Sequence, residues 1–212
     1  LPFKVTPDTL IPRPETEELV AWVLHDKRSE KKVQQNVAKD TIELLDIGTG
    51  TGCIAISLAT HLKGAQVSAL DISEKALEVA KENASLAKAA VHFFKDDILS
   101  AKQLPQPYDV IVSNPPYVRA LEQSRMQPNV VKHEPDTALY VTDEDPLVFY
   151  RAIASLARDH LKPNGNLYFE INEYLSKEMQ QMLEQMGFVE IELKKDIFGA
   201  FRMLKCRPDV YT

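Results

Sequence analysis

Apolar and polar residues alternate along this chain in blocks that predict strands and helices in turn. Four short, almost continuously apolar runs are typical of buried strands, and they lie at residues 41–48, 66–71, 91–94 and 108–113. The intervening residues 53–62 and 73–87 repeat apolar positions at helical spacing, and Ser73 is a suitable N-cap for the second helix. Strands separated by helices are expected to run parallel in an α/β sheet that is covered on both faces.

The second half of the chain continues this alternation and then departs from it. A long irregular stretch is expected at residues 118–145, and a turn at 163–165. The remaining elements are expected at 146–161 and 176–186 for helices, and at 166–171, 188–193 and 201–206 for strands. No helix separates the last two strands, so they are predicted to be antiparallel, and one edge of the sheet should carry a reversed strand.

The first forty residues are predicted to lead into this sheet. Residues 14–25 read as a helix, because Pro14 suits a first helical turn and the glutamates that follow favour its positive end. Residues 26–40 are polar and charged and should form a surface segment. We therefore divide the chain into a hairpin or helix segment at 1–40 and one α/β domain at 41–212.

Composition narrows the classes of function. With 212 residues, 44% hydrophobic content and a net charge of −6, the chain is expected to form one domain without the basic face of a nucleic-acid binder. It contains no apolar run near the roughly 20 residues of a membrane helix, and its first residues do not resemble a signal peptide. Two cysteines and scattered histidines predict a cytoplasmic protein with neither a disulfide framework nor a metal site. We expect a monomer.

A glycine-rich loop between the first strand and the first helix of the sheet predicts a cofactor site. The loop is Gly48, Thr49, Gly50, Thr51 and Gly52. Glycines at the carboxyl end of a strand let the backbone approach a ligand, and Asp71, ending the next strand, can accept hydrogen bonds from ribose hydroxyls. The spacing G-x-G-x-G differs from the dinucleotide fingerprint G-x-G-x-x-G. It resembles motif I of class I S-adenosyl-L-methionine (SAM) methyltransferases, in which an acid at the position of Asp46 faces the cationic end of the cofactor.

Two further groups follow the third and fourth strands. In the methyltransferase pattern, an acid after the third strand contacts the adenine amino group beside an apolar residue. Asp97 with Ile98 fits this pattern, and Asp96 is the alternative acid. The fourth strand ends in Asn114, Pro115, Pro116 and Tyr117, which resembles the motif of methyltransferases that act on planar nitrogen. Asn114 would also border the cofactor.

The chemistry of planar nitrogen explains the residue types of this second motif. An amide nitrogen is a weak nucleophile because its lone pair is delocalised. The side-chain oxygen of Asn114 and the carbonyl oxygen of Pro115 can accept its N–H bonds, while Tyr117 packs over the flat group. The prolines hold the two acceptors in place, so positioning replaces a classical general base.

Four segments together resemble the release factor glutamine N5-methyltransferase family. They are residues 9–20 (TLIPRPETEELV), 45–59 (LDIGTGTGCIAISLA), 114–117 (NPPY) and 133–139 (HEPDTAL). The resemblance implies methyl transfer from SAM, leaving S-adenosyl-L-homocysteine, to the Gly-Gly-Gln glutamine of class 1 peptide chain release factors. It also implies that Pro14, Glu15 and Thr16 close the cofactor pocket and that Glu134 and Pro135 shape the substrate entrance. The helical N-terminal domain of the family is expected to be absent, so residues 41–212 would be the catalytic domain.

Two other functions use the same motifs. One is an N-methyltransferase acting on an exocyclic amine of a nucleic-acid base, in ribosomal RNA or DNA, against which the acidic balance argues. The other is a non-catalytic protein that retains a cofactor fold.

Overall fold

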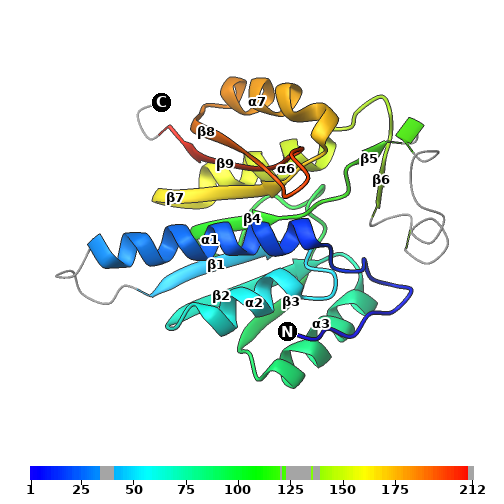
Figure 1. The fold of residues 1–212 in the computed structure, drawn as a ribbon, viewed down its shortest axis with the longest axis vertical. Coiled ribbons are helices and arrows are strands. Elements are labelled where there is room, and N and C mark those ends of the chain that lie inside the picture. The colour runs from blue at the N-terminus through cyan, green and yellow to red at the C-terminus, as the bar shows by residue number, and fades with distance from the viewer. Residues whose placement is uncertain (34–40, 120, 123–134, 136–138, 210–212) are drawn as a thin grey trace.

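A seven-stranded sheet forms the centre of the computed structural model, which describes residues 1–33, 41–119, 121–122, 135 and 139–209. The strand order is β3-β2-β1-β4-β7-β9-β8 (Figure 1). The strands are β1 (Ile42–Ile47), β2 (Ala65–Asp71), β3 (Val91–Lys95), β4 (Tyr108–Ser113), β7 (Leu161–Glu170), β8 (Phe188–Lys195) and β9 (Phe201–Pro208). The four strands predicted in the first half of the chain are thus confirmed.

Strand directions follow the connections, as predicted. β1 pairs in parallel with β2 and β4, β2 with β3, and β4 with β7. The connections between successive parallel strands are long enough to return the chain to the edge at which the preceding strand began. β9 pairs antiparallel with both β7 and β8. The reversed strand is therefore β9, and the outermost strand is β8. The fold class is a doubly wound, mostly parallel α/β sheet.

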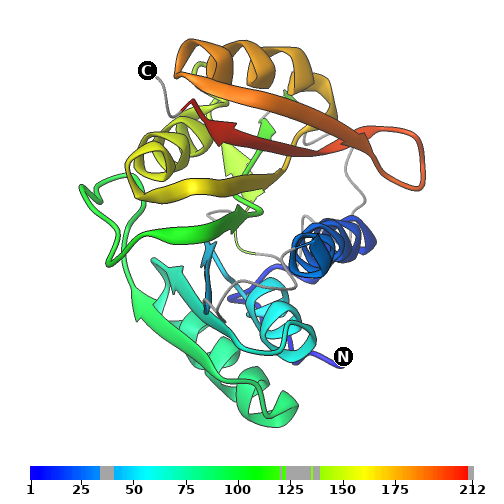
Figure 2. The same cartoon turned by 90° about the vertical axis from the view of Figure 1, so that its left-hand side faces the viewer.

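Helices cover both faces of this sheet. They are α1 (Pro14–Val33), α2 (Cys53–His61), α3 (Glu74–Ala87), α6 (Val148–His160) and α7 (Ser176–Gln185). Leu19 and Val23 of α1 belong to one hydrophobic cluster with Leu58 of α2, whereas residues of α6 and α7 belong to a second cluster. Figure 2 shows the sheet between α1 and α2 on one side and α6 on the other. Ser73 caps α3 as predicted, by accepting a hydrogen bond from the backbone of Ala76 at 3.2 Å.

The N-terminal helix is longer than predicted. α1 continues to Val33, so residues 26–33 of the expected polar surface segment extend the helix that was predicted to end at residue 25. Lys27 is only 1% exposed, and its ammonium group lies 2.8 Å from Glu30 one turn later, which allows a charged residue to face the core. The described part of residues 1–40 contains a turn and this helix but no hairpin. Residues 34–40 lie outside the described residues.

The second half of the chain differs from prediction at two places. Within the stretch expected to be irregular, β5 (Val118–Arg119) and β6 (Tyr140–Val141) pair in a two-stranded parallel sheet, while Glu134 lies outside the described residues. β7 begins at Leu161, so the turn expected at 163–165 is instead an irregularity within the strand. At Gly165, β7 approaches the backbone of β4 closely. A Cβ at this position would be 2.9 Å from the Tyr108 carbonyl oxygen, so glycine allows the two strands to stay together here.

Three structural findings concern the membrane segment, the metal site and the disulfide bonds that were considered from the composition. In the part of the chain that the structure describes, no helix combines the length and apolar character needed to cross a membrane. Among those same residues no three His, Cys, Asp or Glu side chains gather in a way that could hold a metal ion. Cys53 and Cys206 are both free thiols.

Candidate functional site

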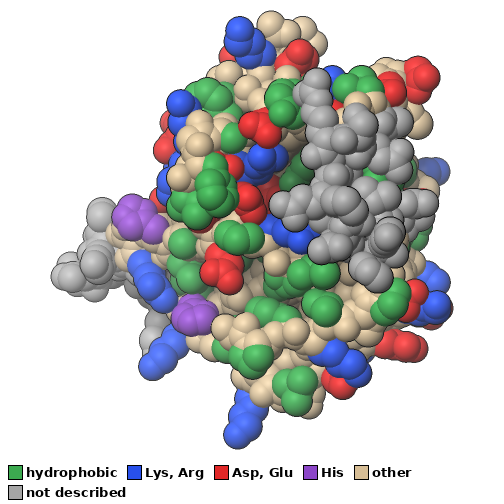
Figure 3. Space-filling view, turned by 45° about the vertical axis from the view of Figure 1, so that its right-hand side comes forward, with side chains coloured by type: hydrophobic (Ala, Val, Ile, Leu, Met, Phe, Trp, Pro, Cys, Tyr) green, Lys and Arg blue, Asp and Glu red, His purple; other side chains and the backbone are tan. Residues whose placement is uncertain are grey.

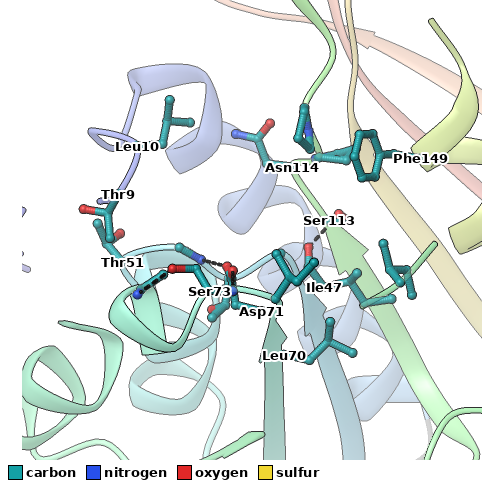
Figure 4. A pocket seen from close by; sticks show the side chains of 18 of the residues that line it. Thr9, Leu10, Ile47, Thr51, Leu70, Asp71, Ser73, Ser113, Asn114 and Phe149 are labelled. Atoms are coloured by element: carbon teal, nitrogen blue, oxygen red, sulfur yellow. Dashed lines mark hydrogen bonds between the residues drawn. The ribbon is translucent and has the colours of Figure 1, made fainter. Parts of the chain in front are cut away.

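A cavity of about 560 Å³ opens at the carboxyl edge of the sheet, between the neighbouring parallel strands β1 and β4 (Figure 4). The strand order reverses here, because the chain continues from β1 to β2 on one side and from β4 to β7 on the other. This point of divergence is where open α/β sheets bind their ligands, and the volume lies within the usual range for small-molecule pockets. Most of the predicted site residues line it: Gly48, Thr49, Gly50, Thr51, Asp71, Asp97, Ile98, Asn114, Pro115 and Pro116. Asp46, Gly52 and Tyr117 are not among the lining residues.

Hydrogen bonds attach the glycine loop to the end of β2. The backbone amides of Gly48 and Thr49 donate to the Leu70 carbonyl oxygen at 2.9 and 3.0 Å, and that of Gly50 donates to Asp71 Oδ2 at 2.9 Å. Gly48 and Gly50 have φ of +72° and +54°, which favour glycine. A Cβ at either glycine would meet no heavy atom of the described chain within 4 Å. The loop thus leaves open space for a ligand beside its backbone.

Asp71 combines a structural bond to the loop with capacity for a ligand. Its Oδ1 accepts the Ser73 amide at 2.9 Å and its Oδ2 accepts the Gly50 amide, which uses two of about four acceptor positions of a carboxylate. Burial raises the pKa of Asp71, and the amide hydrogen bonds oppose that shift. Asp71 lines the cavity, so ribose hydroxyls could donate to its remaining acceptor positions, and this carboxylate fits a nucleoside.

Asp46 lies beneath the glycine loop. Its Oδ2 accepts hydrogen bonds from the Thr49 hydroxyl at 2.6 Å and from the Ala55 amide of α2 at 3.2 Å. Its Oδ1 is buried without a partner among the described residues. Burial raises the pKa of Asp46 to about 7, although the bonds from Thr49 and Ala55 act in the opposite direction. Its orientation toward the cationic end of a cofactor stays a prediction.

The raised pKa of Asp46 predicts a measurable pH dependence of stability. Between about pH 4 and 7 the folded chain holds a proton on Asp46 that the unfolded chain has lost, so this group lowers the free energy of unfolding as pH rises. Each pH unit inside the window costs at most about 1.4 kcal/mol. We expect Asp46→Asn, which stays neutral, to be less pH-dependent than the wild type in urea unfolding between pH 5 and 8. Parallel pH profiles of the two proteins would contradict this prediction.

The two candidate adenine-binding acids both line the cavity. Asp97 Oδ1 accepts the Leu99 amide at 3.0 Å, and Asp96 Oδ1 accepts the Asp97 amide at 2.8 Å. Both side chains therefore help to form the turn after β3, and each retains one oxygen without such a bond among the described residues. Ile98 directly follows the two acids, lines the same cavity and packs against the hydrophobic core, as expected for a residue that supports a flat base.

The Asn-Pro-Pro-Tyr segment contributes the opposite wall. The Ser113 hydroxyl donates to the Ile47 carbonyl oxygen at 2.7 Å, which ties the end of β4 to β1. Asn114 Nδ2 donates to Thr16 Oγ1 at 3.3 Å. Tyr117 points behind this wall instead, where its hydroxyl donates to Glu170 Oε1 at 2.9 Å. Burial raises the pKa of Tyr117 well above its ordinary value.

The chain before α1 forms a wall that the motifs alone did not reveal. Thr9, Leu10 and Pro12 line the cavity, as does Thr16, which the family resemblance had indicated (Figure 4). Asn83 of α3 anchors this segment, because it exchanges hydrogen bonds with the backbone of Lys4 at 2.8 and 3.0 Å. The Asn83 Nδ2 also donates to the Thr51 carbonyl oxygen at 3.0 Å, so one side chain joins the segment to the glycine loop.

Other lining residues also lack a sequence signal. Tyr140 of β6 and Phe149 of α6 also line the cavity, and Figure 4 shows Phe149 on the side of Asn114. They are single aromatic residues outside any motif. Only their elements' positions at the carboxyl edge of the sheet bring them to the site. Pro135, which the resemblance had placed near the substrate entrance, also lines the cavity, although its neighbours lie outside the described residues.

Comparison with known proteins indicates a methyltransferase, the class of enzyme that the sequence motifs predict. Residues 26–137 match the family model of the methyltransferase small domain. The chain is 50% identical over 205 residues to a release factor glutamine methyltransferase of Flavobacterium psychrophilum, covering 97% of this chain and 70% of that protein. It is 48% identical to a protein of the same name from Bacteroides thetaiotaomicron, covering 95% of this chain and 69% of the relative.

Solved structures support the fold independently of sequence. The catalytic domain of human METTL16, in complex with MAT2A 3′UTR hairpin 6, has a TM-score of 0.70 at 19% identity and covers 97% of this chain and 74% of its own. The N-terminal domain of the same protein in complex with SAH has a TM-score of 0.64 at 15% identity, with the same coverage. The predicted fold, that of class I SAM-dependent methyltransferases, is thereby confirmed.

Proposed function

This chain belongs to the release factor glutamine methyltransferase family, and from that premise we propose that it methylates the N5 side-chain nitrogen of the Gly-Gly-Gln glutamine in a class 1 peptide chain release factor. The observation that carries this proposal is the Asn114 carboxamide at the wall of a cavity whose opposite wall is the glycine loop. A flat amide entering beside Asn114 would therefore meet a methyl donor held by the loop.

The methyl donor of this enzyme class is SAM, and the cavity suits it. Bound SAM supplies an electrophilic methyl group on a positively charged sulfur, which is already a good leaving group. We assign its nucleoside part to the loop Gly48–Gly52, to Asp71, and to Ile98 with Asp97 or Asp96. The open space beside Gly48 and Gly50 and the remaining acceptor positions of Asp71 support this assignment.

The chain's own contribution to the reaction is to orient the acceptor nitrogen. Asn114 Oδ1, which accepts no hydrogen bond among the described residues, and the Pro115 carbonyl oxygen would accept the two N–H bonds of the glutamine amide. Held between them, the nitrogen directs its lone pair toward the donor, and it releases a proton to water after transfer. Pro115 and Pro116 restrict the backbone, so this arrangement needs little reorganisation. Tyr117 supports the segment from behind through its bond to Glu170.

Surface charge agrees better with a protein substrate than with a nucleic acid. On the face shown in Figure 3, lysine and arginine side chains are dispersed among acidic ones rather than gathered in one basic patch. We propose a cytoplasmic monomer whose partner is the release factor, without direct contact to nucleic acid. We also propose residues 41–212, with α1 packed on them, as the catalytic unit.

The decisive experiment offers the chain its proposed substrate and the alternative ones. Release factor, total RNA and genomic DNA are incubated separately with the chain and methyl-labelled SAM. We expect label in the release factor, mapped by peptide mass spectrometry to the Gly-Gly-Gln glutamine. A release factor with alanine in place of that glutamine is the matched control and should stay unlabelled. Label in RNA or DNA, with none in the release factor, would replace this function with the alternative one.

A further inference from the structure

A buried carboxylate lies behind the candidate site, outside the cavity itself. Glu170 ends β7 and is 1% exposed. Its Oε2 accepts a hydrogen bond from the Thr16 hydroxyl at 2.6 Å, and its Oε1 accepts one from the Tyr117 hydroxyl at 2.9 Å. Thr16 is itself in contact with Asn114, and Tyr117 ends the segment that Asn114 begins. Glu170 therefore touches both sides of the segment that would hold the acceptor.

The direction of these hydrogen bonds determines the orientation of Asn114. An ionised carboxylate can only accept, so the single hydroxyl hydrogen of Thr16 must point to Glu170. The Thr16 oxygen can then only accept from Asn114, and it does so from Nδ2 at 3.3 Å. Consequently Asn114 Oδ1 is turned away from Thr16. Figure 4 shows the amide nitrogen on the side of Leu10 and the oxygen on the other side.

This orientation matters because a carboxamide has an acceptor at one end and a donor at the other. With Oδ1 exposed to the substrate, Asn114 accepts an N–H bond of the incoming amide. With the group rotated, it would present its own N–H bonds to those of the substrate, and the two donors would repel each other. At the position of Asn114, shape alone does not distinguish the two states, so something else must select one.

We propose that Glu170 is a positioning residue that fixes the Asn114 carboxamide, through Thr16, with its oxygen toward the methyl acceptor. This inference rests on the proposed function, since it assumes that the acceptor is an amide bound at Asn114. Through Oε1 the same carboxylate also holds Tyr117, so one side chain restrains both ends of the Asn-Pro-Pro-Tyr segment.

The surroundings of Glu170 support its role as an acceptor. Burial raises the pKa of this carboxyl, whereas the bonds from Thr16 and Tyr117 and the positive charge of Arg202 lower it. Arg202 is itself held by ion pairs with Glu173 at 3.2 Å and Asp196 at 3.5 Å. The two donors and the cation oppose this rise without cancelling it, so the network with Glu170 as acceptor only is the one that forms at pH values above its raised pKa.

The first test is a double-mutant comparison. Glu170→Gln keeps the size of the side chain but has only one acceptor oxygen for its two donors, so Thr16 is no longer forced to point away from Asn114. We expect kcat to fall roughly 10- to 100-fold in the wild-type background and less than about 2-fold in an Asn114→Ala background. The SAM dissociation constant should stay within about 2-fold. Equal losses in both backgrounds, or no loss at all, would overturn the proposal.

Two further substitutions separate positioning from general stability. Thr16→Val removes the hydroxyl and should lower kcat like Glu170→Gln, and Thr16→Ser should restore at least about tenfold of kcat relative to Thr16→Val. Glu190→Gln is the matched control, because Glu190 lies near the start of β8, at the opposite edge of the sheet, with its side chain 66% exposed. It should leave kcat unchanged. If Glu170→Gln does not unfold cooperatively, the Thr16 pair carries the same test.

A spectroscopic readout keeps this inference distinct from the proposed function. The Asn114 side-chain amide gives a pair of NMR signals, identified by their loss in Asn114→Ala. In the wild type we expect one fixed, exchange-protected pair, and in Glu170→Gln and Thr16→Val a shifted, less protected one. An unchanged pair would reject the role of Glu170 even if the enzyme methylates release factor. A wild type that shows the protected pair but no methyl transfer would reject the proposed function and leave the Glu170 network established.

Discussion

Replacing Asn114 with alanine is expected to lower kcat for methyl transfer by roughly 30- to 1000-fold, which corresponds to about 2–4 kcal/mol. The side-chain oxygen is one of two acceptors that orient the glutamine nitrogen, and its loss leaves only the Pro115 carbonyl oxygen. A delocalised lone pair depends on this orientation, so the loss acts on the transition state. The affinity for SAM should change little, because the glycine loop and Asp71 lie on the opposite wall.

Single-turnover kinetics and calorimetric titration with SAM check the two parts of this prediction separately. Asn164→Ala is the matched control, because Asn164 is exposed in the irregular start of β7, at the other edge of the sheet. It should retain full activity. Unchanged turnover of Asn114→Ala would remove this residue from the mechanism. A large loss of SAM affinity with normal turnover at saturation would make it a cofactor-binding residue only.

Replacing Gly52 with alanine is expected to destabilise the chain by about 2–5 kcal/mol. Gly52 has φ of +81°, where a Cβ costs about 1–2 kcal/mol. The added Cβ would also lie 2.8 Å from Ile56 Cδ1 and 3.1 Å from the Ala80 Cβ of α3, and such overpacking typically adds about 1–3 kcal/mol. The third glycine of the loop thus serves the packing of α2 against α3, whereas Gly48 and Gly50 leave room for a ligand.

Urea unfolding of Gly52→Ala beside Gly64→Ala separates the two costs. Gly64 has the same φ of +81°, but a Cβ there would meet nothing within 4 Å. The Gly64 variant should therefore lose only about 1–2 kcal/mol. The difference between the variants measures the contacts of the added Cβ with Ile56 and with α3. Equal losses would mean that the loop moves away from α3 at no cost, which contradicts the packing role of Gly52.

Local sequence patterns correctly predicted the elements that consist mainly of apolar residues or that end at a clear sequence signal. β4 was predicted at its observed bounds because its apolar residues end at Val112, directly before Ser113 and the Asn-Pro-Pro-Tyr segment. The bounds of α1 and β7 were wrong because contacts that the apolar pattern does not show contribute to them. In α1, the buried Lys27 pairs with Glu30 one turn later, and in β7, residues near Gly165 stay in the strand with β4 lying against them.

The candidate site shows the same limit. Motifs predicted ten of the lining residues, because a close backbone approach or a rigid acceptor requires particular residue types at fixed spacing. Leu10 and Phe149 reach the cavity only through folding, and their residue types carry no chemical signal. Glu170 is a lone acid at the end of an apolar strand in the sequence. Its importance depends on Thr16 and Tyr117, which lie 154 and 53 positions away along the chain.

The anchoring of the first residues by Asn83 has a thermodynamic consequence. The Asn83 side chain bonds to Lys4 and to Thr51, so the opening segment and the glycine loop share one point of attachment. A ligand that contacts both walls gains affinity when the opening segment is already docked, and linkage requires that the ligand strengthen this docking by the same factor. Occupancy of the cavity and order at the start of the chain are therefore two readouts of a single coupled equilibrium.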